Sequence, residues 1–502
     1  MNKEQYHALC ETCDQLLLAS DSSVERVAIP WLHVIRPHAI FLNKYLNIFT
    51  LRPLPIARAR IRNFLSSLRH LTKAILGGGS FWTGVGEFPD RSDVLILSHL
   101  VSGSFRDAED DFYYGKVACE LTSQGLSTTI ALINYTKSAP ASLLRLWKES
   151  TINRVIFSPS LSFSEELALY RRAHKEARSL KCSQVLQPST LGRRVLALAA
   201  EEASSGGAVS ALRLGEQVKS LVTRLRPKAI IVTFEGHSWE RVAFASARTV
   251  SPNILCIGYQ HAALFNMQHA AQRKLANVYN PDVILTSGDV SRLRLQNNVQ
   301  LRGTCIRTLG SNRSIRRQAV SFAQNREITR SSCLVLPEGI DSECILLFSF
   351  TLECAKRMPN IEFIWRLHPN MSFETLMQSN SKFRKLPSNV VLSKATLVED
   401  IKRSRWAMYR GSTAIVQAVM SGVLPIYLHR SGEIPIDTLY EISHLRMRVK
   451  EVKEFSSIAT AIESPEAVAN LELAQDYCAQ LFTPMRSEVL AACIKESSDV
   501  TK

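Results

Sequence analysis

Short, continuous apolar runs alternate with helical patterns along most of this chain, and this alternation restricts the fold more than any other feature. The first series of runs comprises Val94–His99, Thr128–Asn134, Arg154–Ser158, Ala229–Phe234, Ile254–Tyr259 and Asp282–Ser287. A strand that is buried on both faces of a parallel sheet is apolar throughout, rather than at every second residue. Helical patterns such as Phe112–Gln124 and Ala211–Leu225 separate the runs. The series therefore predicts a doubly wound α/β domain.

A second series of the same kind begins after Leu309–Arg313 and a polar stretch that extends to about residue 331. Its predicted strands are Cys333–Leu336, Glu362–Leu367, Asn389–Ser393, Trp406–Arg410 and Val423–Leu428, with helices at Glu343–Met358 and Ala414–Met420. Two sheets in tandem also suit a length of 502 residues, which is too long for one ordinary core. We therefore predict two Rossmann-like domains with a hinge near residues 310 to 330.

Four segments follow from this pattern. We expect an N-terminal helical and basic region over residues 1–85, a first Rossmann-like domain over 86–312, a second over 313–464, and a helical C-terminal tail over 465–502. The tail could pack across either domain.

The charge balance of the chain is strongly basic. The formal net charge is +16, which suits a polyanionic partner such as nucleic acid, an anionic membrane face, or phosphorylated and acidic sugars. Nucleic-acid binding would rest on charge alone, because the chain has no zinc-finger spacing and no aromatic RNA-binding strand motif. We therefore expect no nucleic-acid partner.

Cysteine usage and the N-terminus predict a reducing compartment. The eleven cysteines are scattered, and the polar start of the chain does not read as a secretion signal. Cys10 and Cys13 form one C-x-x-C near His7, but no second ligand pair follows at zinc-finger spacing. We expect a cytoplasmic protein with reduced thiols and no metal site.

A basic segment follows the least polar part of the N-terminal region. No run of about 18 uncharged apolar residues occurs, so we expect no membrane span. At helical spacing, however, the segment interleaves cationic side chains with Leu, Ile and Phe: the cations are Arg52, Arg58, Arg60, Arg62, Arg69 and Lys73. It could lie on an anionic bilayer, as on the inner face of a plasma membrane. It could equally be a solvated helix face that packs on the body of the protein.

Glu235 is the first candidate catalytic residue. It directly follows the predicted strand Ala229–Phe234, and Gly236 lets the backbone turn after it. Ligands of open parallel sheets bind beyond the carboxyl ends of the strands. We expect partial burial to raise the pKa of Glu235 toward the working range of a general base. His237 and Glu240 are alternative bases, and a carboxylate that merely stabilises a helix N-terminus is the structural alternative.

His368 and Pro369 form the second candidate site. They follow the predicted strand Glu362–Leu367, and the proline biases the backbone before it toward an extended form. An imidazole held there could donate a hydrogen bond to a phosphate or ribose oxygen. Arg366, which lies in the same strand, is included with them as a candidate for binding the same ligand.

Gly411, Ser412 and Thr413 form the third candidate site. They connect the predicted strand Trp406–Arg410 to the helix that starts at Ala414. Backbone N–H groups, two hydroxyls and the positive helix end can all face one phosphate. The structural alternative is a simple N-cap, because Ser and Thr are favoured there.

Five further residues occupy comparable places. Glu338 and Gly339 follow the strand Cys333–Leu336 and are candidates for binding the same ligand as His368 and Ser412. Gln260, His261 and Asp111 are candidates for the acceptor side or for the cleft between the domains, and their surroundings look like those in surface-polysaccharide proteins.

The three sites together resemble one group of enzymes. A Glu-Gly pair in the first domain, with His-Pro and Ser-Thr in the second, resembles bacterial GT-B glycosyltransferases that use cytidine-nucleotide sugars. These are the sialyl- and polysialyltransferases and, more loosely, the Kdo transferases of capsule and lipopolysaccharide assembly. The resemblance covers roughly residues 90 to 430, and Phe234 stands where the group usually has a second acid.

The resemblance implies a fold and roles for the motifs. It implies a GT-B fold, an acceptor domain followed by a nucleotide-sugar donor domain across a cleft. Glu235 would be the general base, His368-Pro369 would contact the nucleotide, and Ser412-Thr413 would bind its phosphate. The donor would be a CMP-activated sugar such as sialic acid or Kdo, and the acceptor a glycan or lipid-linked glycan.

The implied reaction is a direct displacement that inverts the anomeric carbon without a metal or cofactor. Two alternatives share its features. A CDP-polyol phosphotransferase would also use a His-Pro and a hydroxyl pair. A nucleotide-sugar 2-epimerase on the same fold would need several acids around the sugar, of which only Glu235 and Glu338 are well placed.

Overall fold

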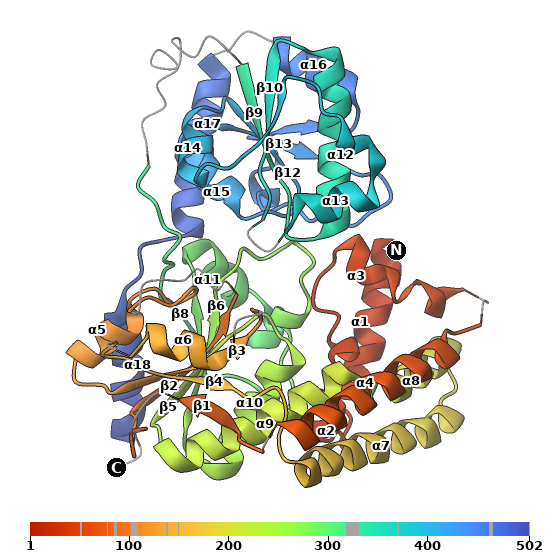
Figure 1. Ribbon diagram of the computed structural model, residues 1–502, viewed down its shortest axis with the longest axis vertical. Coiled ribbons are helices and arrows are strands. Elements are labelled where there is room, and N and C mark those ends of the chain that lie inside the picture. Colours follow the sequence, from red (N-terminus) through yellow and green to blue (C-terminus); the bar gives the residue numbers. More distant parts are fainter. Residues whose placement is uncertain are drawn as a thin grey trace.

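The chain folds into two parallel sheets and a helical region, as the computed structural model shows (Figure 1). The structure describes residues 1–50, 53–77, 79–84, 88–101, 109–136, 139–148, 150–317, 331–368, 371–460 and 465–500. The predicted fold class is confirmed: the protein is α/β, with two doubly wound domains and an N-terminal helical extension. Every predicted strand overlaps an observed one. The expected hinge falls largely on residues 318–330, outside the described residues.

The first sheet has eight strands in the order β1-β4-β3-β2-β5-β6-β7-β8. They are β1 (Trp82–Gly84), β2 (Val94–Leu100), β3 (Thr128–Asn134), β4 (Asn153–Phe157), β5 (Ala229–Thr233), β6 (Leu255–Gln260), β7 (Val283–Thr286) and β8 (Cys305–Thr308). Only the β1–β4 pair is antiparallel. The buried, apolar β2, β3, β5 and β6 form the centre of the sheet, as continuous apolar runs require.

Helices cover both faces of this sheet. They are α5 (Val117–Ser123), α6 (Pro140–Leu146), α9 (Gly206–Leu225), α10 (Ser238–Val250) and α11 (Asp289–Gln296). α9 and α10 pack their apolar sides on one face, while α5 packs on the other together with α18 (Ser487–Val500) from the end of the chain. The first domain is therefore completed by the C-terminal helix.

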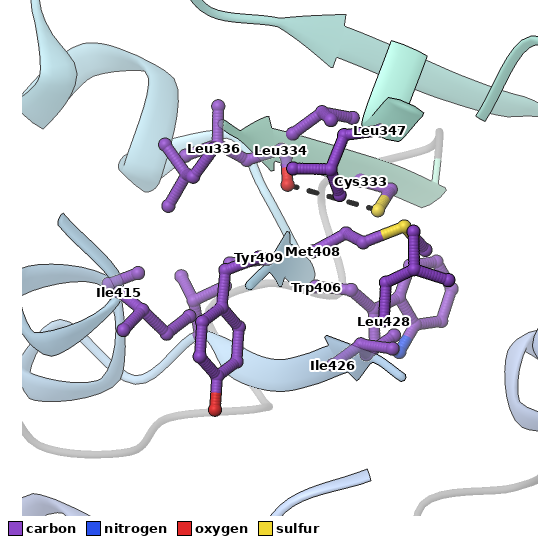
Figure 2. Packing of buried hydrophobic residues seen from close by; sticks show 14 of the residues in the cluster. Cys333, Leu334, Leu336, Leu347, Trp406, Met408, Tyr409, Ile415, Ile426 and Leu428 are labelled. Carbon is purple, nitrogen blue, oxygen red and sulfur yellow. Dashed lines mark hydrogen bonds between the residues drawn. The ribbon is translucent and has the colours of Figure 1, made fainter. Parts of the chain in front are cut away.

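The second sheet has six parallel strands in the order β11-β10-β9-β12-β13-β14. They are β9 (Ser331–Leu336), β10 (Ile361–Trp365), β11 (Val390–Leu392), β12 (Trp406–Tyr409), β13 (Leu424–Leu428) and β14 (Met447–Val449). Its helices are α12 (Asp341–Arg357), α13 (Phe373–Ser379), α14 (Leu397–Lys402), α15 (Ala414–Met420), α16 (Val452–Thr460) and α17 (Pro465–Leu481). Figure 2 shows Cys333, Trp406, Met408 and Ile426 of β9, β12 and β13 packed in one core.

A separate helical region flanks the first domain. Its helices are α1 (Lys3–Leu17), α2 (Val24–Val27), α3 (Ala39–Asn43), α4 (Ile56–Leu76), α7 (Phe163–Leu186) and α8 (Thr190–Glu202). α7 and α8 come from the chain between β4 and β5, yet they share one apolar core with the N-terminal helices. The N-terminal segment is therefore not an independent unit.

Short 3-10 helices occupy several of the connections. They are η1 (Pro30–His33), η2 (Leu46–Phe49), η3 (Ala270–Gln272), η4 (Asn277–Tyr279), η5 (Val299–Leu301), η7 (Ser381–Arg384) and η8 (Tyr440–Ile442). No helix in the described ranges combines the length and the apolar character that crossing a bilayer requires.

The strand order fixes where a ligand can bind. In both sheets the chain first builds outward on one side, then returns to the centre and builds on the other side. This reversal falls between β2 and β5 in the first sheet and between β9 and β12 in the second. Such switch points leave a crevice beyond the carboxyl ends of the two central strands. Glu235 follows β5, and Glu338 and Gly411 follow β9 and β12.

Candidate functional site

The turn after β5 can only be built with glycine at position 236. Gly236 has φ +86°, and a Cβ on it would lie 2.3 Å from the carbonyl oxygen of Ala270. Glu240 receives the N–H groups of this turn: its Oε2 accepts from Gly236 and His237 at 2.8 Å each, and also from Glu235 at 3.0 Å. The turn therefore holds Glu235 and His237 side by side at the N-terminus of α10.

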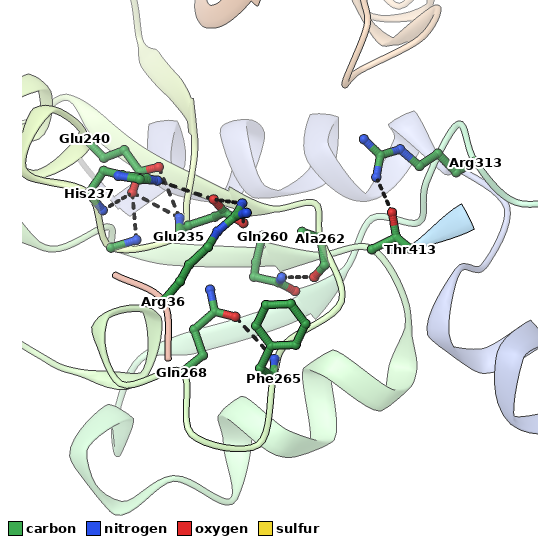
Figure 3. A network of polar contacts seen from close by, with 11 residues as sticks. Arg36, Glu235, His237, Glu240, Gln260, Ala262, Phe265, Gln268, Arg313 and Thr413 are labelled. Carbon is green, nitrogen blue, oxygen red and sulfur yellow. Dashed lines mark hydrogen bonds and ion pairs between the residues drawn. The ribbon is translucent and has the colours of Figure 1, made fainter. Parts of the chain in front are cut away.

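The carboxylate of Glu235 lies between two basic side chains (Figure 3). Nη2 of Arg36 donates to Oε2 at 3.1 Å and to Oε1 at 3.3 Å, and Nε2 of His237 lies 3.3 Å from Oε2. Burial raises the pKa of Glu235, but Arg36, His237 and His261 together bring that pKa well below its ordinary value. The sequence-based expectation of a raised pKa is wrong, because it did not include Arg36. Glu235 is ionised at neutral pH.

Glu240 is not positioned as an alternative base. Its side chain is 1% exposed, and its oxygens are occupied by the three backbone N–H groups of the turn. Burial raises the pKa of Glu240 to about 7. Its place is that of an N-terminal helix carboxylate, the role that the sequence left open for Glu235. His237 is more accessible, and the carboxylates of Glu235 and Glu240 outweigh its burial and raise its pKa.

Three strand ends of the second sheet meet at one place. A Cβ on Gly339 would lie 2.8 Å from Cγ of the His368 ring, and a Cβ on Gly411 would lie 2.5 Å from Oε2 of Glu338. β10, β9 and β12, which these residues follow, are adjacent in the sheet. The structure therefore brings Glu338, Gly339, His368 and Gly411 together, and a side chain at position 411 would have to displace the Glu338 carboxylate. Pro369 lies outside the described residues.

Thr413 faces a cation from the chain after β8. Nη1 of Arg313 lies 3.4 Å from Oγ1 of Thr413 (Figure 3). Thr413 occupies the N-cap position of α15, but its side chain makes no capping hydrogen bond. Arg313 also helps lower the pKa of His368 and of His261, although burial is the larger cause for both. Arg313 thus sits between the strand ends of the two sheets.

The N-terminal segment crosses from one sheet to the other. Arg36 contacts Glu235 of the first domain, and two residues later Nε2 of His38 lies 3.4 Å from Oε2 of Glu338 and 3.2 Å from Oε1 of Glu343 in the second. Nδ1 of His38 accepts the backbone N–H of Ile40 at 3.1 Å. This segment therefore contributes side chains to both clusters and links them.

His38, Glu338 and Glu343 lie close enough together to hold a metal ion. The hydrogen bond from Ile40 occupies Nδ1 of His38, so the proton of the neutral ring is on Nε2, the atom that faces the carboxylates. The two facing carboxylates outweigh burial and raise the pKa of His38 to about 9; a charged ring also carries a proton on Nε2, but its Nδ1 would then no longer accept the N–H of Ile40. In either state a protonated Nε2 of His38 faces two acids. The absence of a metal stays a prediction.

Other candidate residues lie elsewhere or serve the scaffold. Nη1 of Arg366 pairs with Asp400 at 2.8 Å and does not join the donor-side cluster. Asp111 is buried and accepts the Ser98 hydroxyl at 2.9 Å together with two backbone N–H groups of its own turn. Gln260 is fully buried at the end of β6, where it donates to the carbonyl of Ala262. Their contacts hold turns and connections, and the ligand-binding roles expected for these three residues stay predictions.

His261 does join the first-domain cluster. Its ring lies 4.3 Å from that of Tyr113, and burial lowers the pKa of His261 to about 3, so the imidazole is neutral. Its charge interaction with Glu235 therefore applies only at a pH low enough to protonate the ring. Ser412 lies between Gly411 and Thr413 at the start of α15, partly buried.

Sequence reasoning missed Arg36, His38, Arg313 and Glu343. The strand-end rule could have found Arg313 had the short strand β8 been predicted before it. Glu343 lies in the first turn of α12, where an acidic residue has an ordinary structural explanation. Nothing in the sequence around Arg36 and His38 connects them to strands some two hundred residues or more away.

Comparisons with known proteins bear on the fold alone. No family model matches the chain, and the search of curated proteins finds no match. Among solved structures it is similar to a MnaA–UDP co-structure from S. aureus, with 10% identity, coverage of 81% of this chain and 97% of that one, and a TM-score of 0.47. It is also similar to the glycosyltransferase SnogD from Streptomyces nogalater, with 12% identity, coverage of 80% and 99%, and a TM-score of 0.45. A third is UDP-GlcNAc 2-epimerase from Neisseria meningitidis bound to UDP-GlcNAc, with 12% identity, coverage of 80% and 99%, and a TM-score of 0.46.

Proposed function

We propose that this protein is a GT-B glycosyltransferase that moves a sugar from a nucleotide donor to a glycan acceptor. The observation that carries the proposal is the juxtaposition of two strand-end clusters, each at the switch point of its sheet. One holds the ionised Glu235 with His237, and the other holds His368, Gly411 and Thr413. Arg313 and the Arg36–His38 segment connect them.

The second-domain cluster supplies the groups that a nucleotide phosphate needs. The imidazole of His368, the hydroxyls of Ser412 and Thr413 and the guanidinium of Arg313 are hydrogen-bond donors, and Arg313 adds a fixed positive charge. Donors held in place can stabilise the negative charge that develops on a departing phosphate. This chemistry needs no metal, so we propose a metal-independent displacement.

The first-domain cluster supplies the base. We assign proton acceptance from the acceptor hydroxyl to the Glu235–His237 pair, whose facing atoms lie 3.3 Å apart. Because the two groups interact strongly, their protonation belongs to the pair rather than to either residue. Attack on the face opposite the leaving nucleotide inverts the anomeric carbon.

The donor that we propose is a CMP-activated sugar such as sialic acid or Kdo. The support is the joint His-Pro and Ser-Thr pattern, although Pro369 lies outside the described residues. The acceptor would be a glycan or lipid-linked glycan of capsule or lipopolysaccharide synthesis, on the cytoplasmic side of a membrane.

A nucleotide panel tests the proposal. A ligand that binds only the folded protein raises its melting temperature, so CMP, CDP, UDP and ADP can be ranked by thermal shift and then by calorimetry. We expect CMP to bind most tightly and His368→Ala to weaken its binding. If UDP binds more tightly than CMP, the donor carries a nucleotide other than CMP. If no nucleotide binds, the proposal is wrong. A CDP-polyol phosphotransferase would instead prefer CDP and release CMP from CDP-ribitol or CDP-glycerol.

A nucleotide-sugar 2-epimerase is the second candidate. One observation favours it: Glu343 and His38 add an acid and an imidazole beside Glu338, where the sequence offered a single acid. Epimerisation at C2 breaks and remakes a C–H bond. Incubation with UDP-N-acetylhexosamines in D₂O, without an acceptor, would therefore incorporate deuterium at C2 if this candidate is right.

A further inference from the structure

Helix α4 is amphipathic, and its large apolar side chains are exposed. Ala59, Asn63 and Ala74 are buried against the helical region, where α4 packs on α7, α8 and α9 (Figure 1). Six apolar side chains on the other faces are between 55% and 82% exposed: Ile61, Phe64, Leu65, Leu68, Ile75 and Leu76. With 3.6 residues per turn, Phe64, Leu65 and Leu68 share one side of the helix. Exposed aromatic and aliphatic side chains gathered on one helix face indicate an interaction surface.

Cations border this apolar strip along the helix. At helical spacing, Arg58, Arg62, Arg69 and Lys73 fall on one flank of the strip, and all four are exposed. Arg62 pairs with Glu202, but the described residues give Arg58, Arg69 and Lys73 no salt bridge. The flank is therefore a row of cations that the protein itself neutralises only in part.

A basic groove borders the other flank. It has a volume of about 770 Å³ and runs between α4 and α7, which are antiparallel, with Phe64 and Leu71 on the α4 side. Its α7 side carries Arg171, Lys175 and Arg178, all exposed. Within the described part of the chain, none of these three has a salt bridge. Apolar side chains thus lie between two basic borders.

We propose that the α4–α7 face docks on an anionic lipid bilayer, with α4 in the plane of the interface. The apolar strip would enter the boundary between headgroups and acyl chains, and the two basic borders would contact the phosphate headgroups. Charge complementarity selects this occupant, because a neutral apolar partner would leave the cations on both sides of the strip without counter-charges. The inference does not depend on the proposed donor or on the reaction.

Vesicle binding by the full chain tests the proposal. We expect the protein to co-sediment with phosphatidylcholine vesicles that contain phosphatidylglycerol and not with phosphatidylcholine alone, and we expect high salt to weaken the binding. The triple variant Phe64→Gln/Leu65→Gln/Leu68→Gln should bind at least about tenfold more weakly. Arg58→Gln/Arg69→Gln/Lys73→Gln should weaken binding by a similar factor and reduce its salt dependence.

Matched controls use exposed residues elsewhere. Val299→Gln/Val398→Gln/Leu473→Gln removes three exposed apolar side chains outside α4, and Arg384→Gln/Lys385→Gln/Lys394→Gln removes three exposed cations of the second domain. Both should bind as the unaltered chain does, and thermal melting checks that all variants fold. Absent binding to anionic vesicles, or equal binding by the α4 variants, would overturn the proposal. So would light scattering that shows a dimer which the Phe64 triple variant dissociates, because a second copy would then cover this face.

Discussion

The two strand-end clusters occupy corresponding positions in their sheets, but their carboxylates are neutralised differently. In the first domain, Glu235 is paired with a guanidinium, and Glu240 is engaged by three backbone N–H groups. In the second, Glu338 and Glu343 both face Nε2 of His38, and Arg410 pairs with Glu343 at 2.8 Å. The first arrangement keeps one ionised acid for chemistry, whereas the second domain places the Thr413 hydroxyl and the His368 imidazole near the Arg313 guanidinium. We therefore expect first-domain residues to control rate and second-domain residues to control affinity.

Glu235→Gln should give the largest effect. Loss of the ionised carboxylate removes the base and the partner of His237, so kcat should fall by about 10²–10⁴-fold. Nucleotide affinity should change little, because the donor-side groups are untouched. Steady-state kinetics with calorimetry on the same preparation measures both. If Glu235→Gln stays active while His237→Gln loses activity, the base is His237 alone.

Substitutions in the second cluster should give the reverse pattern. His368→Ala, and separately Ser412→Ala/Thr413→Ala, should raise the Kd for the nucleotide by about 10- to 100-fold, as loss of one charge-assisted or anion-directed hydrogen bond implies. The effect on kcat at saturating donor should be smaller. Arg366→Ala is a useful control, because Arg366 pairs with Asp400 and should leave the Kd nearly unchanged. A large loss of nucleotide affinity in Arg366→Ala would mean that the nucleotide binds near Arg366 and not at the His368–Thr413 cluster.

Arg36→Gln should shift the pH dependence. Arg36 lowers the pKa of Glu235, so its removal should raise that pKa, and the acid limb of kcat/KM should move to higher pH. We expect about a tenfold loss at mildly acidic pH and a smaller loss at alkaline pH, where the carboxylate is ionised in both proteins. Arg36→Lys should restore most of the original profile. A uniform loss at every pH would mean that Arg36 acts on the structure and not on the charge of Glu235.

The ion pair between Arg36 and Glu235 should also make the stability of the fold depend on pH. Glu235 has a depressed pKa in the folded protein, so its ion pair contributes stability above the unfolded-state pKa. That contribution is lost as the pH falls through the folded-state pKa. Arg36→Gln should therefore have a lower melting temperature than the unaltered chain at neutral pH. Under strongly acidic conditions the difference between the two melting temperatures should become smaller.

The sheets could be predicted from the sequence because their strands are apolar throughout. Three short edge strands were missed, β1, β8 and β14, because each contains a polar residue among its three or four residues, whereas the equally short but wholly apolar β11 was predicted. The long helix α7 was not among the helices named from the sequence, for a different reason. Glu166 and Glu176 are buried in it and pair with Arg213 and Arg26, so polar residues interrupt the apolar periodicity that marks a buried helix face.

The site was predictable only where a residue follows a strand. Glu235, Glu338, His368 and Gly411 were found by that rule. Arg36 lies in the N-terminal region and reaches Glu235 only because the N-terminal helices share a core with α7 and α8. That packing joins segments far apart in the chain, and no local pattern encodes it. The pKa of Glu235 was consequently predicted in the wrong direction.

The smallest effect that we expect concerns the contact between the N-terminal segment and the second domain. His38→Ala removes the basic ring between Glu338 and Glu343, and Glu338 then faces a Glu343 carboxylate that is still paired with Arg410. Local stability should fall by about 1–2 kcal/mol, roughly a 5- to 30-fold increase in amide hydrogen exchange for residues that follow position 38. His38→Gln retains an N–H donor at that place and should restore part of the protection. Arg36 lies two residues before His38, so loss of the His38 contact should also loosen the position of Arg36. His38→Ala should therefore show part of the pH shift expected for Arg36→Gln. Unchanged exchange in His38→Ala would mean that packing of the helical region alone positions Arg36, and the link between the two clusters would then pass through Arg313.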